Sequence, residues 1–396
     1  MTDIRANALP AIPVAATDVP DGGTFVGRAW RPDLAGPAVV ALRDGALVDV
    51  TAAFPTVSLL AAADDPARQL QRARGETIGS LEQVLANTPP ESRDTARPWL
   101  LAPVDLQAIK AAGVTFAVSM LERVIEERAR GNPESAAEIR AEVRRLVGDD
   151  LARLKPGSDA ANALKELLIR QGAWSQYLEV GIGPDAEIFT KAQPMSAVGT
   201  GVDAGLHPRS TWNNPEPEVV LAVAPSGRIV GATLGNDVNL RDFEGRSALL
   251  LGKAKDNNAS CAIGPMLRLF DDSFTLDDVR AMTVTVAVDG PDGFRLDGES
   301  SIARISRDPQ DLVDQLLGAD HQYPDGAVLF LGTMFAPIQD RDAPGKGFTH
   351  KLGDLVSVSA PQLGRLVNRM RLTHDCEPWT FGAGALLRHL ARRGVL

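Results

Sequence analysis

Three carboxylates in one stretch of the chain have the residue type and spacing of a metal site. Glu216 and Glu218 stand two residues apart at the start of an apolar run, and Asp237 follows further along. Alternate residues of an extended strand point to the same face, so both glutamates are directed at one spot. Clustered oxygen ligands suit a hard divalent cation such as Mg²⁺. The pattern alone leaves a second interpretation open, which is a solvated acidic strand edge.

A β-hairpin is the element that must bring the third carboxylate to the first two. The apolar run 219–223 is followed by a Pro-Ser-Gly turn at 225–227, and a second β-rich run covers 228–234. These features predict two antiparallel strands. Asp237 leaves the end of the returning strand, so we expect it to lie beside the two glutamates.

A second group of charged residues follows the hairpin. It contains Arg241, Glu244 and Lys255. A lysine close to a divalent metal and a carbonyl substrate can stabilise an enolate or transfer a proton. Taken alone, Lys253 and Lys255 would be interpreted as a pair of surface lysines.

Composition limits the classes of protein and partner. The chain has 396 residues, 44% of them apolar, and a formal net charge of −10 without a basic run. It therefore shows no footprint of nucleic-acid binding, and no apolar stretch is long enough to span a membrane. Cys261 and Cys376 have no Cys-x-x-Cys partner, so we expect both to be reduced in a cytoplasmic protein.

The pattern along the chain predicts an α+β, β-rich protein in three parts. A β-leaning N-terminal domain covers 1–105, and a helical linker or lid segment covers 106–175. A catalytic β-rich domain covers 176–396. Strands and helices do not alternate as in a doubly wound sheet.

Local patterns predict individual elements of these parts. Residues 39–50 predict a hairpin that turns at Asp44-Gly45, which is a strong two-residue turn signal. Strands are expected over 282–288 and 355–359. Helices are expected over 105–110, 116–130, 133–140 and 160–170, with a lone amphipathic helix over 309–317 in the C-terminal part.

A glycine-rich segment at Gly199-Thr200-Gly201 could suggest a dinucleotide-binding turn. The residues that follow, 207–215, have the composition of a loop where that motif requires a helix. We therefore predict a substrate-lining loop, since glycine lets the backbone approach a ligand closely. Ser196, Gly199 and Arg209 are the candidate contacts in this region.

The C-terminal part resembles the fumarylacetoacetate hydrolase superfamily, and the resemblance covers about residues 105–370. The matching segments occur in the family order. They are Ile188-Phe189-Thr190-Lys191, Glu216-Pro217-Glu218, 235–242, Ala254-Lys255-Asp256 to Gly264-Pro265, 325–333 and 352–356.

The resemblance implies a mixed β-roll catalytic domain behind a smaller N-terminal domain, with a helical insertion, in a homodimer or homotetramer. It also implies that Glu216, Glu218 and Asp237 hold Mg²⁺, or another divalent cation such as Mn²⁺ or Ca²⁺, which chelates a 2-keto acid. Lys255 would lie near the reacting carbonyl with Arg241 as its cationic neighbour. Asn239 and Thr333 would join the substrate contacts named above.

The departures from the family pattern concern the reaction. Hydrolases of the superfamily carry a histidine and a glutamate that activate water for carbon–carbon cleavage. At the matching positions this chain has Ser119 and Glu122. A serine alone cannot take a proton from water near neutral pH. Glu244 also stands where the hydrolases often have glutamine. The resemblance therefore favours metal-assisted elimination over hydrolysis.

Two further segments, 174–185 and 255–261, are similar to those of bacterial 2-keto-3-deoxy-D-xylonate dehydratases in the superfamily. This similarity implies dehydration of a 2-keto-3-deoxy-pentonate to 2,5-dioxopentanoate in non-phosphorylating pentose breakdown. Glu122 and Lys255 are the candidates for proton transfer, and Ser119 would position a hydroxyl or a water. The alternatives are an acylpyruvate-type hydrolase, a 2-keto acid decarboxylase, or a non-catalytic ligand-binding protein.

Overall fold

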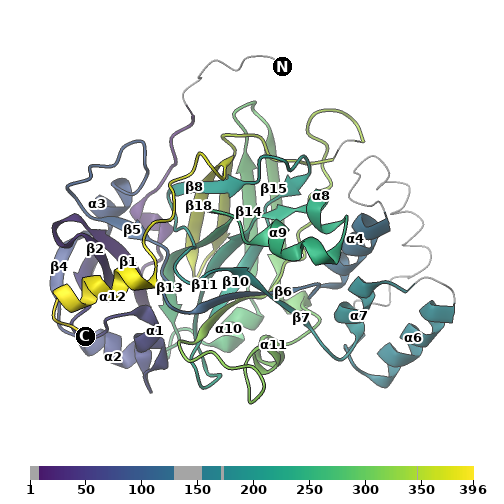
Figure 1. Ribbon diagram of the computed structural model, residues 1–396, viewed down its shortest axis with the longest axis horizontal. Helices are drawn as coiled ribbons and strands as arrows, with labels where there is room; N and C mark the ends of the chain where they lie inside the picture. Colours follow the sequence, from purple (N-terminus) through teal and green to yellow (C-terminus); the bar gives the residue numbers. More distant parts are fainter. Residues whose placement is uncertain (1–8, 129–153, 171–173, 346) are drawn as a thin grey trace.

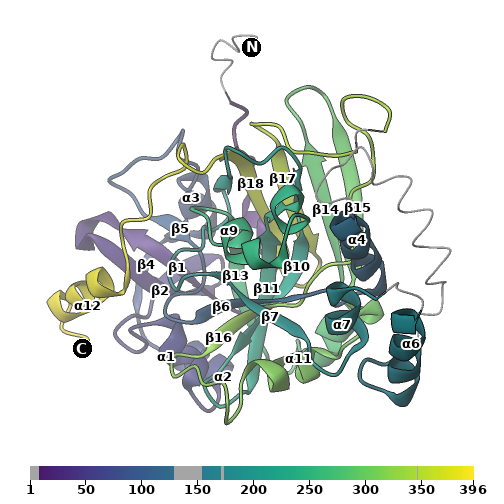
Figure 2. The same ribbon diagram turned by 45° about the vertical axis from the view of Figure 1, so that its right-hand side comes forward.

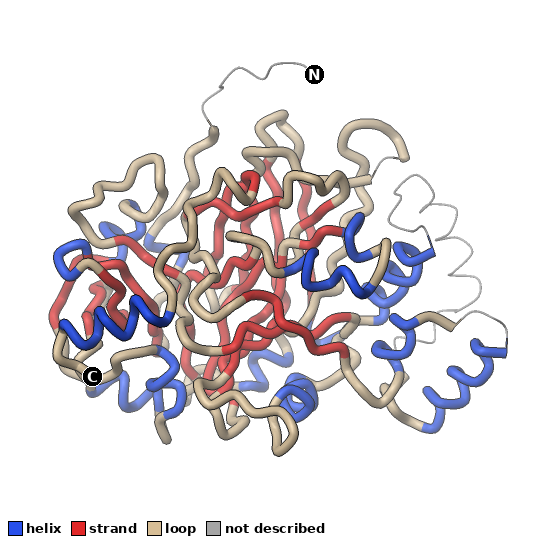
Figure 3. Tube along the Cα trace, in the orientation of Figure 1, coloured by secondary structure: helices blue, strands red, loops and turns tan. Residues whose placement is uncertain are grey.

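The computed structural model of the protein describes residues 9–128, 154–170, 174–345 and 347–396 (Figure 1). Two large β-sheets form its centre, and short helices lie around them (Figure 3). The described part of the chain is therefore β-rich α+β, as the sequence predicted.

The larger sheet contains eleven strands. They are β1 (Thr24–Arg31), β2 (Gly36–Arg43), β3 (Ala46–Asp49), β4 (Glu76–Ser80), β5 (Trp99–Leu101), β6 (Ala108–Gly113), β7 (Glu187–Ala192), β10 (Pro217–Val223), β11 (Ile229–Asp237), β13 (Cys261–Leu269) and β16 (Ala327–Phe330). The order is β4-β3-β2-β1-β13-β11-β10-β16-β6-β7, and β5 pairs with β1. The hairpin β10–β11 that carries the three carboxylates therefore lies in the interior of the sheet.

The second sheet has five strands in the order β15-β14-β17-β18-β8, and two further strands form a small ladder. The bounds are β8 (Val202–Leu206), β14 (Thr283–Asp289), β15 (Arg295–Ser301), β17 (Leu355–Ala360) and β18 (Gly364–Leu372), with β9 (Asn213–Asn214) and β12 (Asn239–Leu240) in the ladder. Both large sheets are mixed, because β16 pairs parallel with β6 and β18 pairs parallel with β8.

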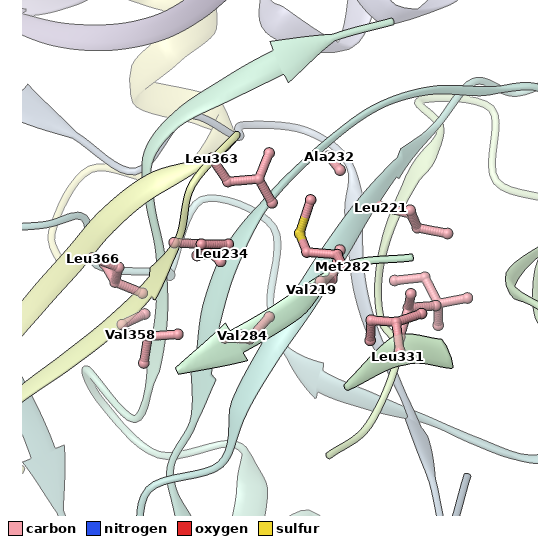
Figure 4. Packing of buried hydrophobic residues seen from close by; sticks show 14 of the residues in the cluster. Val219, Leu221, Ala232, Leu234, Met282, Val284, Leu331, Val358, Leu363 and Leu366 are labelled. Atoms are coloured by element: carbon pink, nitrogen blue, oxygen red, sulfur yellow. The ribbon is translucent and has the colours of Figure 1, made fainter. Parts of the chain in front are cut away.

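The largest apolar core lies between the two large sheets (Figure 4). Val219 and Leu221 of β10 point into it and meet residues such as Val284 and Val358 from the second sheet. Because side chains alternate along a strand, Val220 faces the opposite side and joins a different cluster. Glu218 has the same parity as Val220, so its carboxylate emerges on the side away from the main core.

Eleven α-helices are formed within the described residues. They are α1 (Val57–Ala62), α2 (Pro66–Arg72), α3 (Leu81–Ala86), α4 (Ala117–Arg128), α6 (Asp159–Arg170), α7 (Gln176–Ile182), α8 (Arg241–Glu244), α9 (Leu251–Lys255), α10 (Leu276–Arg280), α11 (Pro309–Leu316) and α12 (Ala383–Arg392). Helices α4, α6 and α7 gather at the end of the molecule away from β1–β4 (Figures 1 and 2).

Most of the local predictions are confirmed. The hairpin at Asp44-Gly45 forms between β2 and β3, and β10 pairs antiparallel with β11. Helices α4, α6 and α11 match three of the predicted helices, and β14 and β17 match the two predicted strands. The helix predicted over 133–140 lies outside the described residues.

The helix predicted over 105–110 is wrong, because β6 starts at Ala108. Asp105 accepts hydrogen bonds from the backbone N–H groups of Val57 (2.7 Å) and Ser58 (3.0 Å) at the start of α1. These bonds tie the Asp105 carboxylate to α1 and not to a helix of its own segment. The residues that follow pair with β16 and β7. Tertiary pairing outweighs the weak local helical preference.

The expectation of a lone helix in the C-terminal part is also wrong, since α7, α8, α9, α10 and α12 accompany α11 within residues 176–396. Helix α12 packs against β2, where the His389 ring nitrogen lies 2.9 Å from the carbonyl oxygen of Pro37. Among the described helices, none has both the length and the apolar character to cross a membrane. The domain boundaries at 105 and 175 stay predictions.

Candidate metal centre

The β10–β11 hairpin brings the three carboxylates together. Pro217 is paired with Asn236, and the backbone N–H of Asp237 donates to the carbonyl oxygen of Glu216 at 3.0 Å. One oxygen of each of Glu216, Glu218 and Asp237 lies within 4.8 Å of the others. Their exposed fractions are 8%, 3% and 1%, which rules out a solvated strand edge.

Protein donors hold one oxygen of two of these ligands. Glu218 Oε2 accepts the backbone N–H of Gly332 at 2.6 Å. Asp237 Oδ1 lies 3.0 Å from Lys191 Nζ and 3.1 Å from Lys255 Nζ. The second oxygens of Glu218 and Asp237 contact no protein donor among the described residues, so they can bind a cation. The donor set therefore fits a divalent metal that prefers oxygen ligands.

Lys255 lies between three carboxylates. Its Nζ is 3.2 Å from Glu216 Oε2, and 3.1 Å from both Asp237 Oδ1 and Glu244 Oε1. Burial alone would lower the pKa of Lys255, but Asp237, Glu216 and Glu244 together hold that pKa well above its ordinary value. Lys255 is therefore a fixed positive charge at neutral pH.

The carboxylates at this centre outnumber the cations. The acidic groups are Glu187, Glu216, Glu218, Asp237 and Glu244, and the basic groups are Arg123, Lys191 and Lys255. Counted over these described residues with all groups ionised, five negative and three positive charges leave a net charge of −2. One divalent cation would neutralise this excess.

The pKa shifts reflect the same excess. Burial, and then the charges of Asp237 and Glu216, hold the pKa of Glu218 well above its ordinary value. Burial also raises the pKa of Glu216, although Lys255 and Arg123 oppose the shift. Burial would likewise raise the pKa of Asp237, but Lys191 and Lys255 outweigh it and the pKa is lowered.

The pocket over the triad has charged, hydroxyl and apolar walls. Besides the three carboxylates and Lys255, its lining includes Arg123, Tyr177, Glu187, Phe189, Glu244, Leu251 and Thr333. Glu187 and Phe189 are alternate residues of β7, which explains why both face the pocket. Burial raises the pKa of Glu187, and the charge of Arg123 partly opposes the shift.

Several residues predicted from the sequence meet at this centre. Lys255 and Thr333 line the pocket. Asn239 Nδ2 donates to Glu216 Oε1 at 2.9 Å, so Asn239 contacts a ligand carboxylate. Glu122 is buried in α4, next to Arg123, but it is not among the described residues that line the pocket. The side chain of Ser119 lies outside the described part of the chain.

Other predicted residues lie elsewhere. Ser196 and Gly199 line a separate pocket whose walls include Trp30, Trp99 and Trp379. A Cβ atom at Gly199 would lie 2.8 Å from the backbone carbon of Leu101, so close packing of two segments explains this glycine.

The two predicted arginines are also outside the pocket lining. Arg241 is buried, with its guanidinium 5.4 Å from the Trp212 ring centroid. Arg209 is exposed beside the ring of Phe243. Neither residue lines the pocket within the described part of the chain.

Sequence reasoning missed Arg123, Glu187 and Lys191 as residues of the centre. Lys191 closes the segment Ile188–Lys191 that was used for the family resemblance, but no role was assigned to it. Glu187 directly precedes that segment, and period-2 alternation with Phe189 was a usable signal. No pattern around Arg123 indicated that α4 would contact Glu216.

Gly332 provides a test of how the backbone supports the triad. Its φ is +82°, and a Cβ atom there would collide with Thr115 Oγ1 and lie 2.8 Å from the carbonyl oxygen of Ala112. We expect Gly332→Ala to lower the free energy of unfolding by about 3 kcal/mol and to weaken metal binding, because the N–H donor to Glu218 shifts.

Gly345→Ala is the matched control for this substitution. Gly345 has a φ of +80°, and a Cβ atom there would have no neighbour within 4 Å. Gly345→Ala should lower the free energy of unfolding only by the cost of the backbone conformation, about 1 kcal/mol. Urea unfolding of both variants measures the difference, and equal losses would contradict the steric argument.

Comparison with known families finds a match for the part of the chain that carries Asp237 and Lys255. Residues 220–371 match the model of the fumarylacetoacetate (FAA) hydrolase C-terminal domain, so this part of the chain is similar to that family. The match includes Asp237 and Lys255 and begins just after Glu218.

Two curated relatives are dehydratases by name. The 2-dehydro-3-deoxy-D-arabinonate dehydratase of Saccharolobus solfataricus is 28% identical over 185 residues, which cover 47% of this chain and 58% of that protein. The probable 2-keto-3-deoxyxylonate dehydratase of Haloferax volcanii is 30% identical over 192 residues, which cover 48% of this chain and 62% of that protein. The chain therefore aligns with about three fifths of each relative.

Solved structures confirm the fold. An apo 2-keto-3-deoxy-D-arabinonate dehydratase has a TM-score of 0.60 at 18% identity, over 88% of this chain and 99% of that chain. A structure of 2-keto-3-deoxy-D-arabinonate dehydratase complexed with magnesium and 2,5-dioxopentanoate has a TM-score of 0.59 at 19% identity over the same shares. The predicted fold class is thus confirmed as the mixed-sheet FAA hydrolase type.

Proposed function

We propose that this protein is a metal-dependent hydro-lyase that converts a 2-keto-3-deoxy-pentonate into 2,5-dioxopentanoate and water. The observation that carries the proposal is the buried triad of Glu216, Glu218 and Asp237 with Lys255 beside it in a lined pocket. The names of both curated relatives support the same reaction class.

The three carboxylates would hold the divalent cation. We propose Mg²⁺, which is present in the solved complex of a similar fold. When bound, such a cation supplies Lewis-acid polarisation of a 2-keto group. Lys255 adds a fixed positive charge close to Glu216 and Asp237 and is suited to stabilise the enolate formed when C3 loses a proton.

The proton acceptor is more suitably a carboxylate than Lys255, because Lys255 Nζ lies within 3.2 Å of three carboxylates that favour its protonated form. Glu187 lines the pocket, and its raised pKa brings it closer to the working pH of a general base. Glu187 would take the C3 proton as the C4 hydroxyl leaves as water. C5 then loses a proton and C3 gains one, which converts the C3=C4 double bond and the C5 hydroxyl into the 5-aldehyde.

Glutamine variants distinguish Glu187 from Glu122, the acid predicted from the sequence. We expect Glu187→Gln to lower kcat by about 100-fold or more, because general base catalysis contributes that much. The loss with Glu122→Gln should be much smaller, since Glu122 does not line the described pocket. Steady-state kinetics at saturating Mg²⁺ gives both values. A larger loss with Glu122→Gln would assign the base to Glu122.

We propose 2-keto-3-deoxy-D-xylonate as the substrate. In a 2-keto-3-deoxy-pentonate only C4 remains a stereocentre, so the acids derived from D-xylonate and D-arabinonate are the same compound. The names of the two relatives are thus consistent with one substrate. The cytoplasmic location and the homodimer or homotetramer stay predictions.

An aldehyde-product assay tests the reaction. The D and L enantiomers, a six-carbon homologue and an acylpyruvate are each incubated with the protein, with Mg²⁺ and after chelation. We expect 2,5-dioxopentanoate from the D enantiomer only when Mg²⁺ is present. Release of pyruvate from the acylpyruvate would favour a hydrolase, and release of carbon dioxide a decarboxylase. Stoichiometric binding without turnover would indicate a ligand-binding protein.

A further inference from the structure

Arg123 of α4 connects the metal centre to an acid outside the triad. Its Nη2 lies 2.8 Å from Glu216 Oε1, and its Nη1 lies 2.7 Å from Glu244 Oε2. The side chains of Arg123 and Glu244 are 14% and 7% exposed. Charge pairs this far from solvent are little screened, so their arrangement affects the potential at the triad.

Glu244 and Lys255 complete a closed ring of alternating charges. Arg123 bridges Glu216 to Glu244, and Lys255 bridges Glu244 back to Glu216. Each glutamate uses both of its oxygens in this ring. Glu216 therefore differs from Glu218 and Asp237, because both of its oxygens already face a protein cation.

The ring sets a cost on metal binding. A cation that binds Glu216 must share a Glu216 oxygen with Arg123 or Lys255, or displace one of them. A displaced Arg123 or Lys255 can still pair with Glu244. A positive charge at Arg123 opposes the approach of a cation, whereas the negative charge of Glu244 favours it.

The same pair also attaches a helix to the centre. Met120, Val124 and Ile125 of α4 pack in a cluster with residues of α7 and not with the main core. Arg123 carries the salt bridges that run from α4 to Glu216, before β10, and to Glu244 in α8. Loss of either bridge should loosen α4, which also carries the predicted residues Ser119 and Glu122.

We propose that Arg123 and Glu244 are a matched charge couple that sets the metal affinity of Glu216 and holds α4 over the pocket. Arg123 and Glu244 are positioning residues in this role, and the inference rests on the metal centre of the proposed function. It assigns a role to Glu244, whose two oxygens face Arg123 and Lys255.

If the couple exists, removing Arg123 and removing Glu244 should change the Mg²⁺ affinity in opposite directions, and both should increase amide exchange in α4. Titration calorimetry with Mg²⁺ alone should show a Kd about tenfold lower for Arg123→Met and about tenfold higher for Glu244→Gln. The double variant should return towards the wild-type Kd. Backbone amide exchange of α4 should increase in all three variants, because each one breaks the bridge to Glu244.

Two further sets of variants serve as controls. Arg123→Lys keeps the charge but loses the two-pronged geometry, so we expect faster exchange in α4 with little change in Kd. Arg170→Met and Glu166→Gln remove the members of an exposed pair on α6, 3.9 Å apart, and should change neither quantity. Circular dichroism and thermal unfolding establish that every variant is folded.

The outcomes separate this inference from the proposed function. Shifts of Kd in the same direction for Arg123→Met and Glu244→Gln, or unchanged values for both, would overturn the couple. Unchanged exchange in α4 would overturn its attachment to the centre. If the wild type and the variants show the expected Mg²⁺ affinities but the wild type forms no aldehyde, the proposed dehydratase activity would be refuted and the inference about Arg123 and Glu244 would still hold.

Discussion

Glu218→Gln is expected to abolish specific Mg²⁺ binding and to lower kcat by at least about 1,000-fold, which corresponds to about 4 kcal/mol of transition-state stabilisation. The amide has the shape of the carboxyl and can still accept the hydrogen bond from Gly332 N–H at Oε1. It lacks the negative charge that a hard cation requires.

The metal-free Glu218→Gln protein should be at least as stable as the wild type. Burial and the charges of Asp237 and Glu216 raise the pKa of Glu218 in the folded state. An acid whose pKa is raised by folding costs stability as pH rises from its ordinary pKa through the raised one. Glutamine has no such cost, so the gain in stability of the variant over the wild type should be largest at neutral pH.

Calorimetry with Mg²⁺, the aldehyde assay and thermal unfolding in chelator test these three expectations. Glu299→Gln removes an exposed glutamate of β15 and is the matched control. Tight Mg²⁺ binding by Glu218→Gln would show that Glu218 is not a ligand. A large fall in the metal-free unfolding temperature would contradict the repulsion between the carboxylates.

Lys255→Met is the second substitution with a large expected effect. Lys255 Nζ contacts Glu216, Asp237 and Glu244, and the variant leaves these buried carboxylates without their shared cation. Removing one partner of a buried ion pair costs about 3–5 kcal/mol. We expect a loss of that size in the free energy of unfolding without metal, together with loss of turnover.

Mg²⁺ should restore part of the stability of Lys255→Met, because the bound cation neutralises the same carboxylates. It should restore no turnover, since Lys255 also faces the pocket. Urea unfolding in chelator and in Mg²⁺ measures the difference, and Lys253→Met, an exposed neighbour, is the control. Equal stability of Lys255→Met and wild type in chelator would contradict the role of Lys255 as the shared counter-charge.

Local patterns were sufficient where the governing interactions are close in the sequence. The hairpin that holds Glu216, Glu218 and Asp237 follows from two apolar runs and a turn, and the structure pairs them as expected. Helix α4 follows from its apolar spacing. The local pattern after Asp105 wrongly predicted a helix, because Asp105 accepts hydrogen bonds from α1 and the following residues pair with distant strands.

The sequence by itself determined the hairpin that brings the three carboxylates together, because period-2 alternation and turn chemistry are local properties. Only the tertiary structure decided what surrounds that set. Arg123 arrives on α4, Glu187 on β7 and the Gly332 N–H after β16, each from a different part of the chain. Ser196 and Gly199 line a different pocket from the one predicted. The reason is the same, because the packing of segments distant in the sequence decides where a residue lies, and local spacing does not encode that packing.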